Sequence, residues 1–138
     1  MSTVYFSLGA NLGDREAHIR EAIRLIGEEI GPVVRQSSLL VTEPWGFVSP
    51  HPFVNAAVCC TTCKSPREVL VITQQIERRM GRTSKSTDGQ YHDRLIDIDI
   101  LLYDDLTIDE PDLKIPHPLM CERDFVMIPL REILPAAE

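Results

Sequence analysis

The segment from Leu95 to Tyr103 constrains the fold of this chain more than any other. Its even-numbered positions are all apolar: Ile96, Ile98, Ile100 and Leu102. Residues two apart on a strand lie on the same face, so this period predicts a β-strand with one apolar face. We expect Asp97 and Asp99 to lie side by side on the other face, ahead of Leu101 and Tyr103.

The rest of the chain predicts an alternation of strands and helices. Further strands are expected over three segments, 4–8, 33–41 and 53–62. A turn is expected over 9–13, after which Asp14 caps a helix that ends at Gly31. The segment 65–68 combines a capping box with proline at the first helical position, and Gly81 ends this second helix.

The order βαββαβ predicts the fold class. Beyond Tyr103, five prolines permit only short helices: Pro111, Pro116, Pro118, Pro129 and Pro135. We therefore expect an α+β sandwich of ferredoxin-like type, with helices on one face of an antiparallel sheet. A chain of 138 residues fits a single domain spanning 1–138.

Charge restricts the possible partners. The formal net charge of −7 excludes a fold-wide basic surface for nucleic acid. Five cations still fall in one short stretch: Arg78, Arg79, Arg82, Lys85 and Arg94. Each alone is best explained as solvated, but together they favour a focused site for a small anion. No apolar run approaches ~20 residues and no signal peptide is evident, so we expect a cytoplasmic protein without membrane partners.

Cys60 and Cys63 have Cys-x-x-Cys spacing. A zinc site would need a second ligand pair at suitable spacing, and the sequence offers none. A redox pair would need its first cysteine near a helix N-terminus, whereas here a strand ends at the pair. We therefore expect these two cysteines to be small buried residues in a reduced compartment.

Two aspartates in so apolar a strand need an explanation. Their Cβ atoms would lie ~7 Å apart, and at an effective dielectric of ~20 the two charges would repel by roughly 2–3 kcal/mol. A divalent cation would reverse that sign, and oxygen-only ligands favour magnesium completed by a nucleotide phosphate. The alternative is an exposed edge on which Asp97 and Asp99 face water. The nearby Arg94 and the cation-rich segment favour phosphoryl transfer instead.

Four other positions carry less information alone. His117, in a proline-flanked turn, is by itself best explained as a surface histidine. Asn55 and Phe53 share one side of a strand, which suits either a flat heterocycle or the edge of the core. Phe125 could be simple core.

At this point the chain resembles the 6-hydroxymethyl-7,8-dihydropterin pyrophosphokinase family. The resemblance covers nearly the whole chain through blocks in the right order: Gly9–Asp14, Thr42–Gly46, Phe53–Ala57, Gln74–Glu77, Gly81-Arg82, Arg94–Ile100, Ile115–Pro118, Arg123–Val126 and Pro129-Leu130. It implies transfer of diphosphate from ATP to the hydroxymethyl group of the pterin, with release of AMP, in folate biosynthesis. The implied partners are these two small molecules, and the implied state is a monomer or weak dimer.

The resemblance also implies roles for individual residues. Two magnesium ions would be bound by Asp97 and Asp99, which with Arg82 and Arg94 form the catalytic group. ATP would be held by Gln74, Glu77, Arg82, Lys85, Arg94, Ile100, His117 and Arg123. The pterin would be held by Thr42, Pro44, Trp45, Phe53, Asn55 and Phe125. Segments 43–52 and 82–93 match loops that close over the reacting groups, which would exclude water.

The chain departs from the family pattern in its second loop. His92-Asp93 stands where many members carry Gly-Pro, and Ser84 stands where an arginine is common. Tyr91 lies near a position at which some members have tryptophan, and Lys85 offers a replacement cation for the loop. The family domain usually extends beyond the position of Glu138, so a short form and a truncated domain both remain open.

Two other functions fit parts of the pattern. Another two-metal nucleotidyl- or phosphotransferase would use Asp97 and Asp99 but give no role to Phe53, Asn55 or Phe125. A non-catalytic ligand- or RNA-binding module on the same scaffold would display aromatic residues on its central strands. The acidic pair and the net charge disfavour this last hypothesis.

Overall fold

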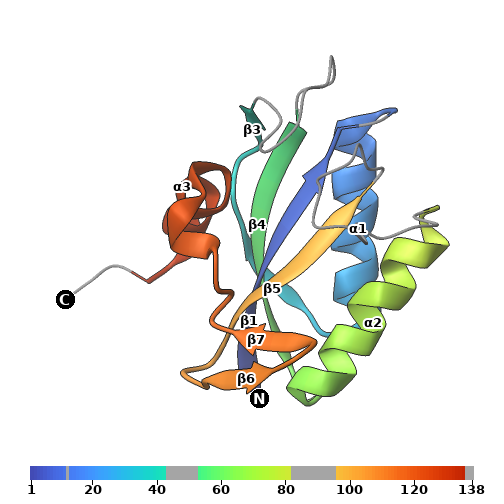
Figure 1. The fold of residues 1–138 in the computed structure, drawn as a ribbon. Coiled ribbons are helices and arrows are strands. Elements are labelled where there is room, and N and C mark those ends of the chain that lie inside the picture. Colours follow the sequence, from blue (N-terminus) through green and yellow to red (C-terminus); the bar gives the residue numbers. More distant parts are fainter. Residues whose placement is uncertain (12, 43–52, 82–95, 136–138) are drawn as a thin grey trace.

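The computed structural model describes residues 1–11, 13–42, 53–81 and 96–135 (Figure 1). The strands are β1 (Ser2–Ala10), β2 (Val33–Gln36), β3 (Leu40–Thr42), β4 (Phe53–Thr62), β5 (Asp97–Tyr103), β6 (Ile108–Glu110) and β7 (Leu113–Ile115). The helices are α1 (Arg15–Glu29), α2 (Pro66–Arg79), the short 3-10 turn η1 (Met120–Glu122) and α3 (Asp124–Ile133). The strand over 53–62 and both long helices are as predicted.

The main sheet is antiparallel, in the order β2-β4-β1-β5, and β3 also pairs with β4. A single strand was expected over 33–41, but the structure divides it into β2 and β3. Ser37 lies at the break, where its hydroxyl accepts a hydrogen bond from the Ala57 backbone N–H at 2.9 Å. A side chain thus replaces a backbone carbonyl in the ladder, and the strand bends there.

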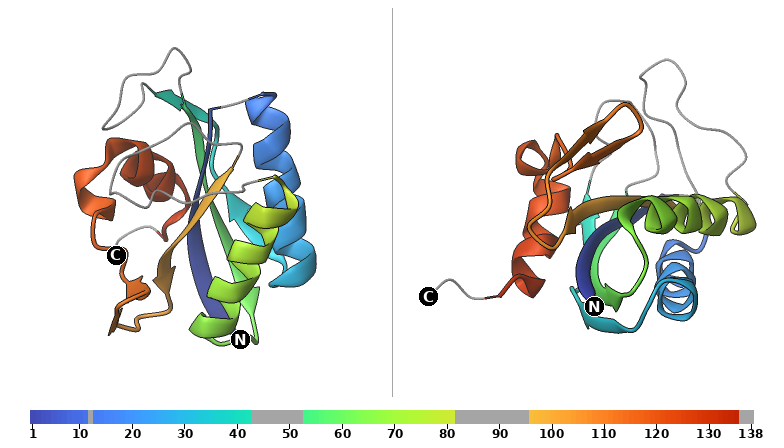
Figure 2. Two further views of the ribbon diagram at one scale, coloured as in Figure 1. Left: turned by 45° about the vertical axis from the view of Figure 1, so that its right-hand side comes forward. Right: turned by 90° about the horizontal axis from the view of Figure 1, so that it is seen from below.

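Helices cover both faces of the sheet, which corrects the expectation of a single covered face (Figure 2). On one face α1 and α2 enclose the main core, with Phe6, Ile26 and Ile76 fully buried. On the other face α3 packs over a second, smaller cluster. Its buried side chains Val126, Leu130 and Ile133 have helical spacing, so the sequence did contain a signal for this helix.

Strand β5 contains a β-bulge that the alternation did not predict. Phe6 pairs with Ile100 and Tyr5 pairs with Leu102, so Leu101 is the extra residue. Leu101 and Leu102 therefore both pack in the α3 cluster. Tyr103 is instead buried in the main core, so the predicted faces of Leu102 and Tyr103 are wrong.

The hairpin of β6 and β7 was not predicted, because three-residue strands are too short for a periodic signal. Pro111 and Asp112 form its two-residue turn. Leu113 and Ile115 are buried in the main core, which anchors the hairpin beneath β5. In Figures 1 and 2 the hairpin lies near the N-terminal end of α2.

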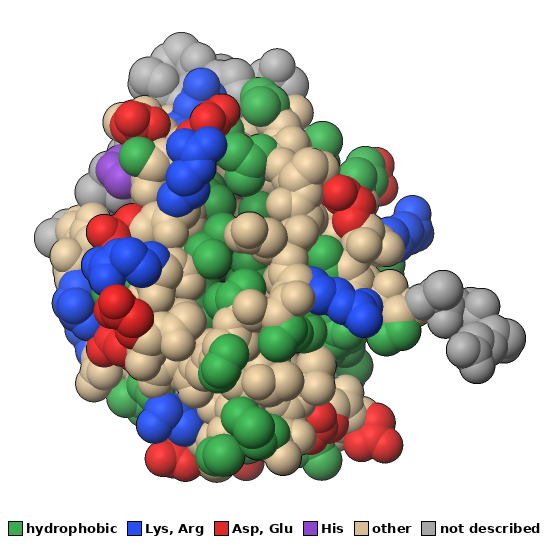
Figure 3. All heavy atoms as spheres, turned by 180° about the vertical axis from the view of Figure 1, so that it is seen from behind, with side chains coloured by type: hydrophobic (Ala, Val, Ile, Leu, Met, Phe, Trp, Pro, Cys, Tyr) green, Lys and Arg blue, Asp and Glu red, His purple; other side chains and the backbone are tan. Residues whose placement is uncertain are grey.

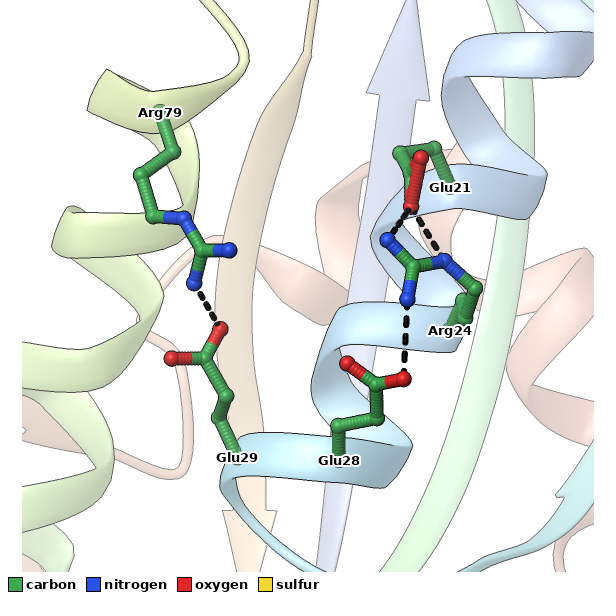
Figure 4. Close-up of polar contacts among 5 residues, drawn as sticks. All are labelled: Glu21, Arg24, Glu28, Glu29 and Arg79. Carbon is green, nitrogen blue, oxygen red and sulfur yellow. Dashed lines mark hydrogen bonds and ion pairs between the residues drawn. The ribbon is translucent and has the colours of Figure 1, made fainter.

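Several ion pairs lie on the surface of α1 and α2. On α1, Arg24 bridges Glu21 and Glu28 (Figure 4). Arg79 of α2 binds Glu29 of α1 at 2.5 Å, so this cation of the basic stretch joins two helices. Figure 3 shows basic and acidic side chains intermingled on the face opposite to Figure 1. None of the helices that the structure describes combines the length and apolar character that a bilayer crossing requires.

The cysteines are all free, but only two are buried. Cys59 and Cys60 lie inside β4, as expected for Cys60. Cys63 and Cys121 are exposed, so the expectation of a buried residue is wrong for Cys63. The chain leaves β4 before Cys63 and places it in the turn that precedes α2.

In the folded protein we expect iodoacetamide to label Cys63 and Cys121 but not Cys59 or Cys60. Burial raises the pKa of the Cys60 thiol to about 12, and burial also raises the pKa of Cys59. Only the thiolate attacks the reagent, and neither buried thiol is accessible. Mass spectrometry of peptides labelled before and after urea unfolding measures this. Equal labelling of Cys60 and Cys63 in the native protein would contradict the burial described here.

Candidate active site

Register brings the acidic pair into line with residues of two other strands. Across β1, Gly9 lies between Asp97 of β5 and Asn55 of β4. Ser7 likewise lies between Asp99 and Ala57. Cross-strand neighbours share a face, and Ala57 belongs to the α3 cluster. The two half-buried aspartates therefore lie on one face, as predicted, and that face is the one covered by α3.

Gly9 creates space beside this pair. A Cβ atom at Gly9 would lie 3.0 Å from Asn55 Oδ1 and 3.6 Å from the Phe53 ring. The amide and the ring therefore extend over bare backbone, next to Asp97. Asn55 is buried and Phe53 half-buried, and their shared side is as predicted. The sequence had assigned Gly9 to a turn, but β1 continues through Ala10.

His117 is held in a defined orientation near the aspartates. Its backbone N–H donates to Leu101 O at 3.0 Å, and its Nδ1 accepts from the Leu119 N–H at 3.3 Å. The neutral ring then carries its proton on Nε2. Burial lowers the pKa of His117, nearby Arg123 lowers it further, and Asp97 opposes the shift. The side chain is thus half-buried and held in one orientation.

Beside the aspartates lies a cavity of about 260 Å³ between α2, β5 and the β6–β7 hairpin. Its apolar wall consists of Leu70, Ile98, Ile100, Pro111, Leu113 and Pro118. Its polar groups are Asp99, Asp112, Lys114 and His117. An apolar wall with a few polar groups is the usual composition of a small-molecule site. Sequence reasoning missed Leu70 and the hairpin, since neither lies in the basic stretch or on the acidic strand.

Helix α2 contributes one stripe of residues to this region, an apolar one followed by two polar ones. Leu70, Gln74 and Glu77 stand at helical spacing, and Leu70 lines the cavity. The buried Glu77 carboxylate accepts a hydrogen bond from the Ile98 backbone N–H at 2.8 Å. Among the described strands β5 is the edge of the sheet, so Glu77 pairs an N–H that none of the other described strands takes. Ile100, two residues on, presents its backbone toward the same edge.

Arg123 and Phe125 lie at the start of α3. Arg123 is 7% exposed, and its guanidinium carbon lies 5.7 Å from the centroid of the Phe125 ring. Its charge acts on His117, as does that of Asp97. The half-buried Phe125 packs against the α3 cluster. The structure thus gathers four predicted polar residues, Asp97, Asp99, His117 and Arg123, around one site.

Several predicted site residues fall outside the described part of the chain. These are Pro44, Trp45, Arg82, Lys85 and Arg94. Thr42 closes β3, but its side chain is not described. Both predicted loops also lie outside the described residues, as do the departures at Ser84, Tyr91, His92 and Asp93.

The donor set fits magnesium better than a transition metal. Within residues 1–11, 13–42, 53–81 and 96–135, no group of three His, Cys, Asp or Glu side chains could hold a metal ion. Two neighbouring carboxylates alone suit a cation that keeps waters and takes further oxygens from substrate phosphates. Asp97 and Asp99 would hold it.

Comparisons with known proteins identify the family of the chain. The family model of 7,8-dihydro-6-hydroxymethylpterin-pyrophosphokinase (HPPK) matches residues 5–135. The 2-amino-4-hydroxy-6-hydroxymethyldihydropteridine pyrophosphokinase of Porphyromonas gingivalis is 48% identical over 136 residues, covering 98% of this chain and 92% of the relative. The protein of that name from Bacillus subtilis is 41% identical over 135 residues, which cover 97% of this chain and 79% of the relative.

Solved structures match the fold. Wild-type HPPK-DHPS of Plasmodium falciparum superposes with a TM-score of 0.76 at 18% sequence identity. The match covers 98% of this chain but only 40% of that larger one. At this identity the likeness supports the α+β architecture alone. The sequence matches decide the family: the chain belongs to the 7,8-dihydro-6-hydroxymethylpterin-pyrophosphokinase family.

Proposed function

We propose that this protein transfers the pyrophosphoryl group of ATP to the hydroxymethyl group of 6-hydroxymethyl-7,8-dihydropterin, releasing AMP, as a step of folate synthesis. One observation carries the proposal: the acidic pair lies between two different sites. Asp99 lines the cavity beside α2. Asp97 is the cross-strand neighbour of Gly9, over which Phe53 and Asn55 extend. Two substrates can therefore meet at the aspartates.

The cavity suits the nucleotide. Its apolar wall, with Leu70 and Leu113, would take the base, and the edge backbone of Ile100 would offer it a donor and an acceptor. Asp99 and His117 are polar residues of the same cavity, and the phosphates of the nucleotide would lie beside them. The neutral His117 can donate from Nε2 to a phosphate oxygen, and the buried Arg123 supplies a fixed positive charge.

The face beside Gly9 suits the pterin. Phe53 and Phe125 would stack on the two sides of the ring, because aromatic rings prefer offset stacking. The Asn55 amide carries both a donor and an acceptor, which matches the mixed edge of a pterin. Thr42, Pro44 and Trp45 would complete this side.

The reaction needs little covalent chemistry from the protein. The pterin hydroxyl oxygen bonds to the β-phosphorus, the bond from that phosphorus to the oxygen of the α-phosphate breaks, and the hydroxyl proton passes to solvent. Positioning and charge neutralisation supply most of the rate. Two Mg²⁺ ions held by Asp97 and Asp99 would neutralise the phosphate oxygens when bound. Arg82, Lys85 and Arg94 would add cations, and Gln74 with Glu77 would border the nucleotide.

Broader features of the proposal concern fold and setting. We infer a ferredoxin-like topology, which the strand order β2-β4-β1-β5 and two helices on one face support. We also infer a cytoplasmic enzyme that works as a monomer or weak dimer.

The direct test is an assay for AMP. The protein, incubated with ATP, Mg²⁺ and 6-hydroxymethyl-7,8-dihydropterin, should form AMP and the pterin diphosphate in equal amounts. Omitting Mg²⁺ or the pterin should stop AMP formation. Equal AMP formation without the pterin would instead indicate another acceptor, and with it a different phosphotransferase.

Gly9→Ala should weaken pterin binding by about ten-fold or more and leave ATP binding within two-fold. The new methyl group would lie 3.0 Å from Asn55 Oδ1, so the amide must shift, whereas its 3.6 Å distance from the Phe53 ring is an ordinary contact. A misplaced hydrogen bond at a buried amide costs roughly 1–3 kcal/mol. Calorimetric titration with pterin and, separately, with α,β-methylene-ATP measures the two effects. An equal loss for both ligands would contradict the placement of the pterin.

A further inference from the structure

Arg67 joins helix α2 to the β6–β7 hairpin. Its guanidinium binds Glu110, the last residue of β6, and Asp112 in the hairpin turn, the latter at 2.8 Å. Arg67 and Glu110 side chains are each 49% exposed, so solvent and salt reach the ion pairs. The three groups form a bridge, which we call the Arg67 bridge, between two elements far apart in the chain.

Helix energetics do not explain a cation at this position. Arg67 is the second residue of α2, and the capping box of Ser65 and Glu68 already satisfies the start of the helix. The N-terminal end of a helix carries partial positive charge, so a cation there is unfavourable. The arginine therefore opposes its own helix, and its compensating contacts are those to the hairpin.

The bridge joins two of the elements that line the nucleotide cavity. Asp112 and its neighbour Pro111 line the cavity from the hairpin, and Leu70 lines it from α2, one turn beyond Arg67. The spacing between Leu70 and the turn thus sets the width of the cavity. Only the turn depends on the bridge, because Leu113 is anchored in the main core.

The turn itself is poorly preorganised. Two-residue hairpins favour turns with positive φ, which suit the twist of the strands. Pro111 fixes its own φ near −65°. Among the described residues other than glycine, Asp104 alone has a positive φ, so Asp112 does not. An external contact therefore has a role in holding this turn.

We propose that Arg67 is a positioning residue, which fixes the hairpin turn against α2 and thereby sets the fit of the cavity to the base end of the nucleotide. The inference rests on the proposed function, which places ATP in this cavity. It assigns a binding role to a surface ion pair that touches no phosphate.

The main test compares Arg67→Ala with Arg24→Ala. Arg24 also bridges two carboxylates and is similarly exposed, at 56%, but it lies on α1 away from the cavity. We expect Arg67→Ala to raise the dissociation constant of α,β-methylene-ATP about three- to ten-fold, the size expected of two exposed ion pairs. Arg24→Ala should leave it within two-fold. KM for the pterin and kcat at saturating ATP should stay within two-fold in both variants.

Further measurements separate positioning from general stability. Arg67→Lys, which can hold one carboxylate but not both, should lose about half of the effect on a logarithmic scale. The combination of Arg67→Glu with Glu110→Arg should bind the analogue more tightly than either single variant. The urea midpoint of Arg67→Ala should be unchanged or slightly raised, because a cation leaves the helix N-terminus. At ~1 M salt the difference from wild type should largely vanish.

Two results would overturn the inference, and they are distinguishable. If wild-type protein binds the analogue and Arg67→Ala binds it equally well, only the role of Arg67 fails. If wild-type protein binds no ATP analogue at all, the proposed function fails and the inference with it. A parallel fall in kcat, pterin affinity and urea midpoint would mark Arg67 as a structural residue and also overturn it.

Discussion

Asp97→Asn is expected to lower the rate of AMP formation by at least about 10³-fold. The substitution keeps the size of the side chain but removes one of the two carboxylates that would hold the metal and its phosphates, and charge stabilisation of this kind supplies several kcal/mol. The protein should remain folded, because removing one of two like charges relieves repulsion in β5. A coupled assay for AMP at saturating substrates measures the loss.

The control for this prediction is Asp105→Asn. Asp105 is an exposed carboxylate in the turn after β5, so its loss should leave the rate within two-fold. A second readout does not depend on turnover. The charge of Asp97 raises the pKa of His117, so Asp97→Asn should lower that pKa further in an NMR titration. Unchanged activity with a shifted histidine pKa would show that the residue is in place but has no role in binding the metal.

Gly31→Ala should destabilise the protein by at least about 3 kcal/mol. A Cβ atom at Gly31 would lie 1.8 Å from the carbonyl oxygen of Thr61, which is backbone and cannot rotate away. Nearby bonds hold the two segments together: the Thr61 N–H donates to Pro32 O at 3.1 Å, and the Thr62 hydroxyl donates to Ile30 O at 2.7 Å. The methyl group would force these bonds apart. Urea unfolding with a shared slope measures the change.

Gly27→Ala is the matched control for that variant. Gly27 lies four residues earlier, inside α1, where a Cβ atom would lie 3.8 Å from Val33 Cγ2 in ordinary contact. Alanine in a helix interior is favoured over glycine by roughly 0.5–1 kcal/mol. This variant should therefore be slightly more stable than wild type. If both variants lost stability equally, the close approach at Gly31 would not be the cause.

The comparison of these glycines shows what sequence patterns can and cannot predict. Gly31 was correctly predicted to follow the first helix, but for the wrong reason. A glycine after a helix usually adopts positive φ, as Gly81 does with φ 101°. Gly31 is required because another strand passes against it, and no local pattern contains that information.

The strands illustrate the same division. Strand β4 was predicted to the residue, because a nearly continuous apolar run is bounded by a proline on one side and a capping box on the other. The split between β2 and β3 was not, because it depends on the Ser37 hydroxyl meeting a backbone N–H of β4. Periodicity reports the faces of a segment, whereas hydrogen bonds between distant segments decide where it bends.

For the site, the alternation in β5 placed Asp97 and Asp99 correctly on one face. The proximity of His117 to Asp97 and Arg123 could not be predicted from the sequence. The three residues come from β5, the turn after β7 and the start of α3, and only the tertiary fold brings them together. Gly9 and the hairpin cavity also required it. Register brings Gly9 beside Asp97, and packing of the hairpin into the main core brings the cavity beside Asp99.

The extra residue at Leu101 shifts the phase of β5 by half a repeat. Upstream, the strand presents its carboxylates on the α3 side; downstream, it sends Tyr103 to the opposite side, where its hydroxyl donates to Lys64 O at 2.5 Å. Without Leu101 the alternation would be uninterrupted, with Leu102 still on the α3 side and Tyr103 still in the main core, but the second cluster would lose a fully buried side chain. The bulge therefore leaves both ends of β5 in register with β1 and gives α3 two adjacent leucines to pack against instead of one.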